Sequence, residues 1–128
     1  MNRFLLKNIL KIDSLAALCA AIFTLGLRNW IAEFYEISAD LVLFVGAVNL
    51  AYGSFGLLNL FSARKKSLFV VLICGNFFWT ICCFGFVLLN FRSLSALPTF
   101  HGLFEGAFVG ALALYESKHF NKIITDQL

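Results

Sequence analysis

Four long apolar runs are the feature that most constrains the fold of this 128-residue chain. They cover Ser14–Ile31, Leu41–Phe61, Leu68–Phe91 and about Pro98–Tyr115. A transmembrane helix needs about 20 mostly apolar residues to cross a hydrocarbon core about 30 Å thick. Backbone inside a bilayer must satisfy its own hydrogen bonds, and the runs lack the alternation of barrel strands, so each run predicts a helix. We therefore expect an all-α fold, with residues 1–128 forming one integral membrane domain, a four-transmembrane-helix bundle.

The composition agrees with this prediction and excludes other classes. Apolar residues make up 61% of the chain, and charged residues make up 13%, about half the usual share in soluble proteins. These values exclude a disordered chain, an ordinary soluble domain and a nucleic-acid-binding module. The lipid bilayer is therefore the expected partner, and no nucleic acid is expected.

The basic residues predict the orientation of the helices. Eight of the ten lie before the first run, between the second and third runs, or after the fourth: Arg3, Lys7, Lys11, Arg64, Lys65, Lys66, Lys118 and Lys122. Arg28 and Arg92 lie on the other side. By the positive-inside rule both termini are cytoplasmic, most simply in a bacterial inner membrane. The basic start followed by an apolar run lacks an Ala-x-Ala cleavage site, so we expect an uncleaved helix.

Two segments that flank the first run predict short interfacial helices. At the N-terminus, Arg3, Lys7 and Lys11 recur every four residues, with Leu5, Ile9 and Ile12 on the other side of a helix. In the first external loop, Trp30, Phe34 and Ile37 recur at helical spacing, with acidic residues opposite. The second helix is an interfacial anchor in one interpretation and a lid over a pocket in the other.

Small residues recur at helical spacing and predict close contacts between helices. Lipid supplies no hydrophobic drive between helices, so close approach relies on small and polar residues. The contacts lie inside the bundle in one interpretation and in a homodimer, or with another membrane protein, in the other. The residues of the predicted packing faces are Gly102, Gly106, Gly110, Gly46, Gly53, Gly56, Ala16 and Ala20.

Glu105 is the most conspicuous single residue, because it is an acid inside the fourth run. Ionisable groups within a span are costly and by default suggest a functional site. His101 lies one helical turn away on the same face. Two interpretations are open: a site for a proton or cation, or an ion pair with Arg28 or Arg92.

A second set of candidate residues lies near the predicted midplane. Asn49 and Asn76 approach it from opposite sides, and Trp79 and Thr80 lie one turn beyond Asn76. These side chains either line a cavity for a small polar or cationic ligand, with cation–π attraction from the indole, or hydrogen-bond between helices. Asp13 is expected to cap the start of the first span, with a proton-relay role as the alternative.

No catalytic constellation is visible in the sequence. The cysteines Cys19, Cys74, Cys82 and Cys83 all fall in predicted spans without a C-x-x-C pair, so a dithiol oxidoreductase is not indicated. Neither a Ser–His–Asp arrangement nor a phosphate-binding glycine loop occurs. We expect no catalytic residues, no metal site and no cofactor, and hence a protein that is not an enzyme.

The length, the four short spans, Asp13 at the first span and the run Gly-Asn-Phe-Phe-Trp at residues 75–79 resemble the uncharacterised small bacterial four-helix integral membrane proteins. This resemblance implies no particular activity. In size and span count the chain is also similar to small multidrug resistance transporters. Their essential Glu lies in the first span, where this chain has none, so Glu105 would have to take that role.

Two functions follow as hypotheses. The first is a non-enzymatic accessory or interaction subunit, motivated by the glycine-rich faces and the lack of catalytic groups. The alternative is a small-molecule or cation transporter or binder that uses Glu105 and the midplane Asn and Trp residues.

Overall fold

The structure is a computed structural model that describes residues 3–61 and 66–127. In these residues the chain consists of helices joined by short loops. Arg64 and Lys65 lie outside these residues, as do the side chains of Arg3, Leu5 and Lys7. The helices are α1 (Arg3–Gly26), α2 (Arg28–Tyr35), α3 (Ala39–Phe61), α4 (Lys66–Asn90), α5 (Ala96–Lys118) and α6 (Phe120–Gln127). No strand occurs among the described residues, which confirms the all-α prediction.

Four of these helices are long and apolar enough to cross a membrane: Asn8–Gly26 within α1, and the whole of α3, α4 and α5. At 1.5 Å per residue, the shortest of these segments, 19 residues, is about 28 Å long. The chain is therefore a multi-pass helical membrane protein, and the predicted four-helix bundle is confirmed.

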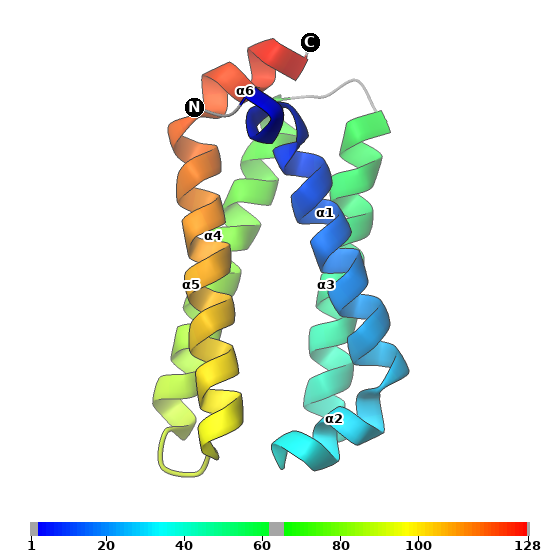
Figure 1. The fold of residues 1–128 in the computed structure, drawn as a ribbon, viewed down its shortest axis with the longest axis vertical. Helices are drawn as coiled ribbons and strands as arrows, with labels where there is room; N and C mark the ends of the chain where they lie inside the picture. Colours follow the sequence, from blue (N-terminus) through cyan, green and yellow to red (C-terminus); the bar gives the residue numbers. More distant parts are fainter. Residues whose placement is uncertain (1–2, 62–65, 128) are drawn as a thin grey trace.

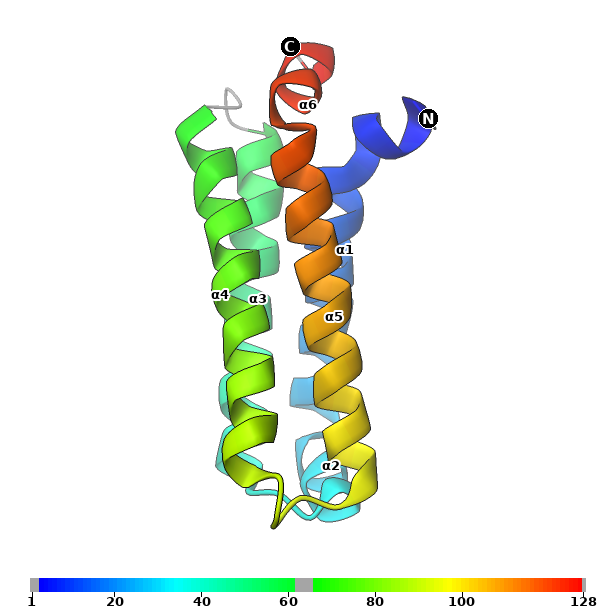
Figure 2. The ribbon, with the colours of Figure 1, turned by 90° about the vertical axis from the view of Figure 1, so that its left-hand side faces the viewer.

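The first span differs from its predicted bounds. The apolar run was expected to cross as Ser14–Ile31, but α1 ends at Gly26 and the chain turns at Leu27 into α2. The predicted interfacial helix at the N-terminus is the start of α1 rather than a separate element, and its first turns lie at an angle to the rest (Figure 2). The predicted loop helix is α2, which ends at Tyr35 because Glu36 adopts a left-handed conformation with φ 55°.

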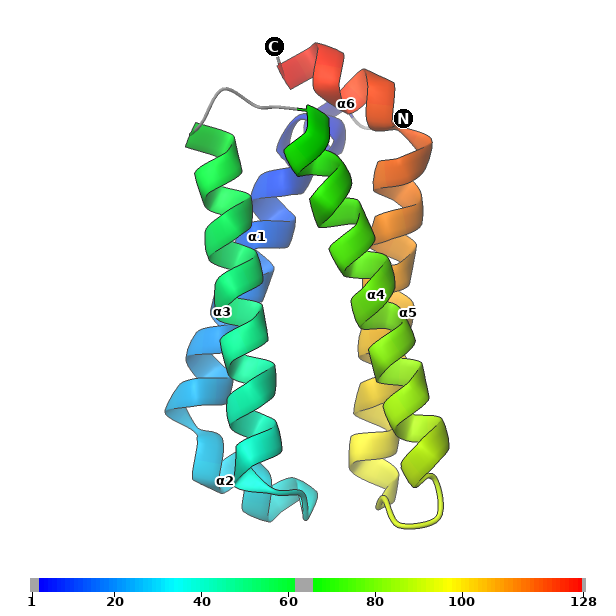
Figure 3. The ribbon, with the colours of Figure 1, turned by 180° about the vertical axis from the view of Figure 1, so that it is seen from behind.

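The long helices are arranged as two hairpins. α1 packs mainly on α3, and α4 packs mainly on α5. Figures 1 and 3 show the hairpins close together at the end where both termini lie, and further apart toward α2. We call these the terminal end and the α2 end. Contacts between the hairpins are therefore concentrated at the terminal end.

Glycines set the close approach within each hairpin. A Cβ atom on Gly53 would lie 2.7 Å from Leu18 Cγ and 2.9 Å from the Ser14 carbonyl oxygen, and one on Gly46 would lie 2.6 Å from Leu25. Gly56 packs in the same way on Ser14. These α3 glycines therefore face α1, as expected for residues that let backbones approach.

The second hairpin uses the G-x-x-x-G face of α5. Cβ atoms added to Gly102, Gly106 and Gly110 would contact Val87, Cys83 and Thr80 of α4, at 2.7, 3.1 and 3.1 Å. The glycine faces thus lie inside the hairpins.

Ala16 and Ala20 do not face α3, so they do not contribute to packing inside this hairpin. Both are exposed, while Ala21 is fully buried and Ser14 is 1% exposed. Successive residues of a helix are rotated by about 100° around its axis. The face of α1 that packs on α3 therefore carries Ser14 and Ala21 instead of Ala16 and Ala20.

An apolar core joins the hairpins at the terminal end. Ile9 and Leu10 of α1 cluster with Phe69, Leu72 and Ile73 of α4 and with Ile123 of α6. Ile123 is fully buried, so α6 is held over the end of the bundle (Figure 1).

Replacing Gly53 with Ala is expected to destabilise the protein, because the new methyl group would meet the Ser14 backbone, which has no room to move. Overpacking of this kind costs about 1–3 kcal/mol. Gly85 provides the control, since a Cβ there meets nothing within 4 Å. Gly85→Ala should leave the free energy of unfolding unchanged or raise it by up to about 1 kcal/mol. Unfolding in mixed detergent micelles measures both, and equal effects would contradict the packing described.

Candidate functional site

One polar residue from each long helix meets between the hairpins, near the terminal end. These residues are Asp13 of α1, Tyr52 of α3, Asn76 of α4 and Glu116 of α5, which we call the four-helix cluster. The Tyr52 hydroxyl donates to Asp13 Oδ2 at 2.5 Å. Asn76 Nδ2 lies 3.2 Å from Asp13 Oδ2 and 3.4 Å from Glu116 Oε2. A single amide group therefore donates to two carboxylates that belong to different hairpins.

The cluster is buried and incompletely hydrogen-bonded. Glu116 is 0% exposed, Asn76 4% and Asp13 8%. Glu116 Oε1 is buried without a hydrogen-bond partner among the described residues, as is the hydroxyl of the neighbouring buried residue Ser14. Unpaired buried polar atoms are costly and call for an explanation, such as an ion or water at the site.

No basic side chain balances these two acids in the described part of the chain, where the ion pairs are Arg28–Asp40 and His101–Glu105. Burying an isolated charge is expensive, and burying two like charges together is more so. A proton or a cation that reduces the negative charge would therefore stabilise the four-helix cluster.

Glu105 belongs to a different group, toward the α2 end. Its Oε1 accepts a hydrogen bond from Trp79 Nε1 at 2.8 Å, and its Oε2 lies 3.5 Å from His101 Nε2. His101 Nδ1 in turn lies 2.8 Å from the Tyr35 hydroxyl of α2. Both carboxylate oxygens are thus engaged. This α2-end cluster links α2, α4 and α5.

The α2-end cluster also acts on Tyr35, which lies outside the spans. Burial raises the pKa of Tyr35 above its ordinary value of 10.0, and the negative charge of Glu105 raises it further. The phenol therefore stays protonated and can donate to a neutral His101 or accept from a charged one.

The residues predicted near the midplane form hydrogen bonds in separate places. Asn76 lies in the four-helix cluster, and Trp79 lies with Glu105 and His101. Asn49 Nδ2 donates to the Val45 carbonyl on its own helix at 3.0 Å. Thr80 Oγ1 likewise donates to the Asn76 carbonyl at 2.9 Å.

The two predicted partners of Glu105 are placed elsewhere. Arg28 pairs with Asp40 at 3.3 Å. Arg92 forms no ion pair among the described residues.

Glu116 was not among the predicted site residues, and helix capping was the main role predicted for Asp13. Glu116 was left just beyond the fourth predicted span, which ended at Tyr115, although α5 continues to Lys118. Asp13 was expected to cap a helix that begins at Ser14, but α1 begins at Arg3. The sequence does carry a signal for this pair. Asp13 and Glu116 are acids within segments that are otherwise basic, and both segments are predicted to lie at the same side of the membrane.

The cysteines lie on two different helices, α1 and α4. All four cysteines are free, with Cys19 and Cys74 exposed and Cys83 buried. Within the described residues, no group of three or more His, Cys, Asp or Glu side chains is placed to hold a metal ion.

Comparisons of the chain with protein families, with curated proteins and with solved structures found no match. The fold and the two clusters therefore define the chain only as a multi-pass helical membrane protein with buried carboxylates between its helices.

Asn76→Leu is expected to destabilise the protein more than Asn49→Leu, a matched change in another span. Asn76 donates to two carboxylates on other helices, whereas the Asn49 amide donates within its own helix. Interhelical hydrogen bonds in membranes average about 0.6 kcal/mol and reach about 1.7. We expect a loss of about 1–2 kcal/mol for Asn76→Leu and less than about 0.5 for Asn49→Leu in micelle unfolding. Equal losses would show that Asn76 does not join the hairpins.

Glu105→Gln is expected to lower the pKa of Tyr35 without restoring its ordinary value. Removing the carboxylate charge makes the phenolate easier to form, but the larger contribution, burial, remains. Tyrosinate absorbance during a pH titration measures the change, and Tyr35→Phe identifies the transition that belongs to this residue. An unchanged Tyr35 transition in Glu105→Gln would contradict the electrostatic coupling.

Proposed function

We propose that the protein is an ion-coupled membrane carrier that binds a proton between Asp13 and Glu116. The observation that carries this proposal is the Asn76 amide, shared by two buried carboxylates from different hairpins. Ionisable residues in membrane spans commonly mark ion pathways and proton sites. The proposal keeps the carrier hypothesis but moves its site from Glu105 to the four-helix cluster.

A proton suits the cluster better than a metal ion. Two carboxylates are few ligands for a metal, since calcium takes six to eight oxygen ligands and sites for magnesium also demand near-octahedral geometry. A single proton shared by a pair of carboxyl groups removes one of the two like charges. It also turns one acid into a hydrogen-bond donor, which suits a pair of groups that otherwise only accept.

The position of the pair gives the proton a mechanical effect. Asp13 lies on α1 and Glu116 on α5, so loss of the shared proton adds repulsion across the contact between the hairpins. A ligand moves a conformational equilibrium only through its different affinity for the two states. The shared proton would bind more tightly when the terminal end is closed, so it would favour the closed arrangement. Each hairpin is held together by its own glycine contacts and is therefore suited to move as a unit.

The accessory-subunit hypothesis has less support. It was motivated by small-residue faces that another protein can use, and the glycines of these faces pack within the hairpins. The eight-to-two distribution of basic residues supports the remaining part of the proposal, cytoplasmic termini in a bacterial inner membrane.

Infrared spectroscopy of the protein in lipid tests the proton site. We expect the carbonyl band of a protonated carboxyl group at neutral pH in the wild type. Glu116→Gln and Asp13→Asn should each shift the frequency of this band, because the remaining buried carboxyl group loses the second group that shares its proton. Glu105→Gln is the matched control and should leave the band in place.

Two results would refute the proposal: absence of the band in the wild type, or its loss on addition of sodium at constant pH, which would indicate a metal cation instead. The carrier role is tested by hydrogen exchange in α1 and α4. If the shared proton controls the contact between the hairpins, wild-type exchange in these helices should resemble that of Glu116→Gln at low pH and become faster than in the variant once the wild type loses the proton at higher pH.

A further inference from the structure

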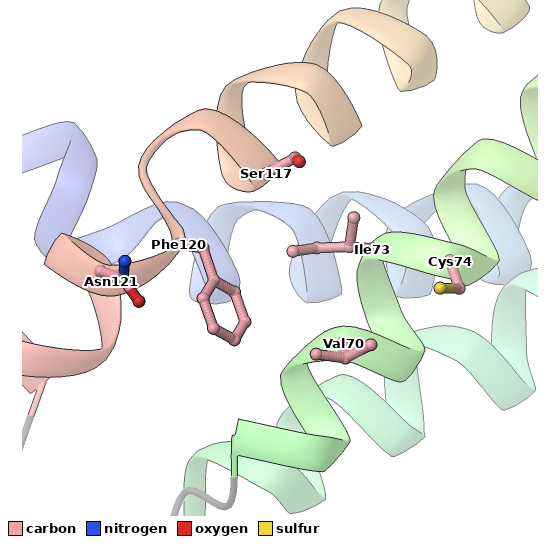
Figure 4. A pocket seen from close by; sticks show the side chains of 6 residues that line it. All are labelled: Val70, Ile73, Cys74, Ser117, Phe120 and Asn121. Carbon is pink, nitrogen blue, oxygen red and sulfur yellow. The ribbon is translucent and has the colours of Figure 1, made fainter.

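A groove lies at the terminal end, and none of the residues that line it belongs to either polar cluster. It has a volume of about 380 Å³. One wall is the start of α4, with Val70, Ile73 and Cys74. The other wall is the corner between α5 and α6, with Ser117, Phe120 and Asn121 (Figure 4). The α4 wall is mostly apolar, and the corner carries a hydroxyl and an amide.

The packing of α6 fixes the shape of this groove. The chain turns at His119, whose backbone N–H bonds to carbonyl groups of the last turn of α5. The Phe120 ring then stacks on Phe69 of α4, with ring centroids 5.5 Å apart and planes 13° apart. Ile123 is fully buried one turn later. The two walls are thus tied together by the core.

The exposed charges of the described side chains near the groove are positive. Among the described side chains at the terminal end, Asp13 and Glu116 are buried, and the exposed charges are all lysines: Lys11, Lys66, Lys118 and Lys122. Lys118 and Lys122 directly follow the polar wall residues Ser117 and Asn121. Basic pockets between spans at such a membrane face bind anionic lipid headgroups.

The depth of the groove also fits a lipid. Val70, Ile73 and Cys74 lie four to eight residues into α4, about 6–12 Å along its axis from Lys66. A bilayer is about 30 Å thick in its hydrocarbon core and about 40–45 Å thick with its headgroups, so each headgroup layer is about 5–8 Å thick. The groove therefore spans the boundary between the headgroups and the acyl chains.

We propose that this groove binds an anionic phospholipid. The phosphate lies at Ser117 and Asn121 beside Lys118 and Lys122, and an acyl chain lies along the apolar wall of α4. The inference does not depend on the proton site.

Protection of Cys74 tests this proposal. Cys74 lines the groove, and Cys19 on α1, also exposed, is an internal reference. The full-length protein in zwitterionic micelles is titrated with phosphatidylglycerol or phosphatidylcholine, treated with a maleimide and analysed by peptide mass mapping. We expect phosphatidylglycerol to protect Cys74 at lower concentration than phosphatidylcholine does, with little difference between the two lipids at Cys19.

Lysine variants supply the matched control. Lys118→Gln and Lys122→Gln should each raise the phosphatidylglycerol concentration that half-protects Cys74 by about fivefold. Lys11→Gln removes the same charge at the same end but outside the groove, and should change it little. Three results would each overturn the proposal: equal protection by both lipids, equal protection of both cysteines, or an equal effect of Lys11→Gln. The groove would then be filled by non-specific lipid or by a protein partner.

Discussion

The contact on which the arrangement of the two hairpins depends is the Asn76 amide shared by Asp13 and Glu116. Within each hairpin, glycines bring the backbones together over most of the helix length. Between hairpins the contacts are concentrated at the terminal end, in the four-helix cluster and the apolar core below α6. Lipid offers no hydrophobic drive for this association, so a polar contact contributes mainly by specifying which helices meet.

Two acids on α5 show how environment separates a structural carboxylate from a candidate ion site. Glu105 has a partner for each oxygen, Trp79 and His101, and the imidazole can carry the compensating charge. Glu116 shares its amide partner with Asp13, keeps one oxygen unpaired and has no basic neighbour in the described structure. The acid that is conspicuous in the sequence therefore has a partner for each oxygen, and the acid at the end of the helix keeps an unpaired oxygen beside a second acid.

Apolar runs and glycine spacing predicted most of the fold, because both act locally along one helix. α3, α4 and α5 begin within two residues of their predicted starts, and the glycine faces lie at helix contacts. The first run was misread because apolar residues continue past Gly26 while the backbone turns. Ala16 and Ala20 show a second limit, since the stripe that faces α3 is set by the rotation of α1 in the bundle. The four-helix cluster could not be predicted for the same reason. Asp13 and Glu116 are about a hundred residues apart, and only the packing of the hairpins brings both acids to the Asn76 amide.

The last turn of α5 connects the two proposed sites. Glu116 and Ser117 are neighbours, and a helix rotates their side chains by about 100°. Glu116 consequently faces the bundle interior and is fully buried, whereas Ser117 is exposed in the groove. Any movement of this turn that follows loss of the shared proton must also move one wall of the groove, because α6 and the Phe69–Phe120 stack are attached directly beyond it. The turn that buries one proposed site therefore also forms part of the wall of the other.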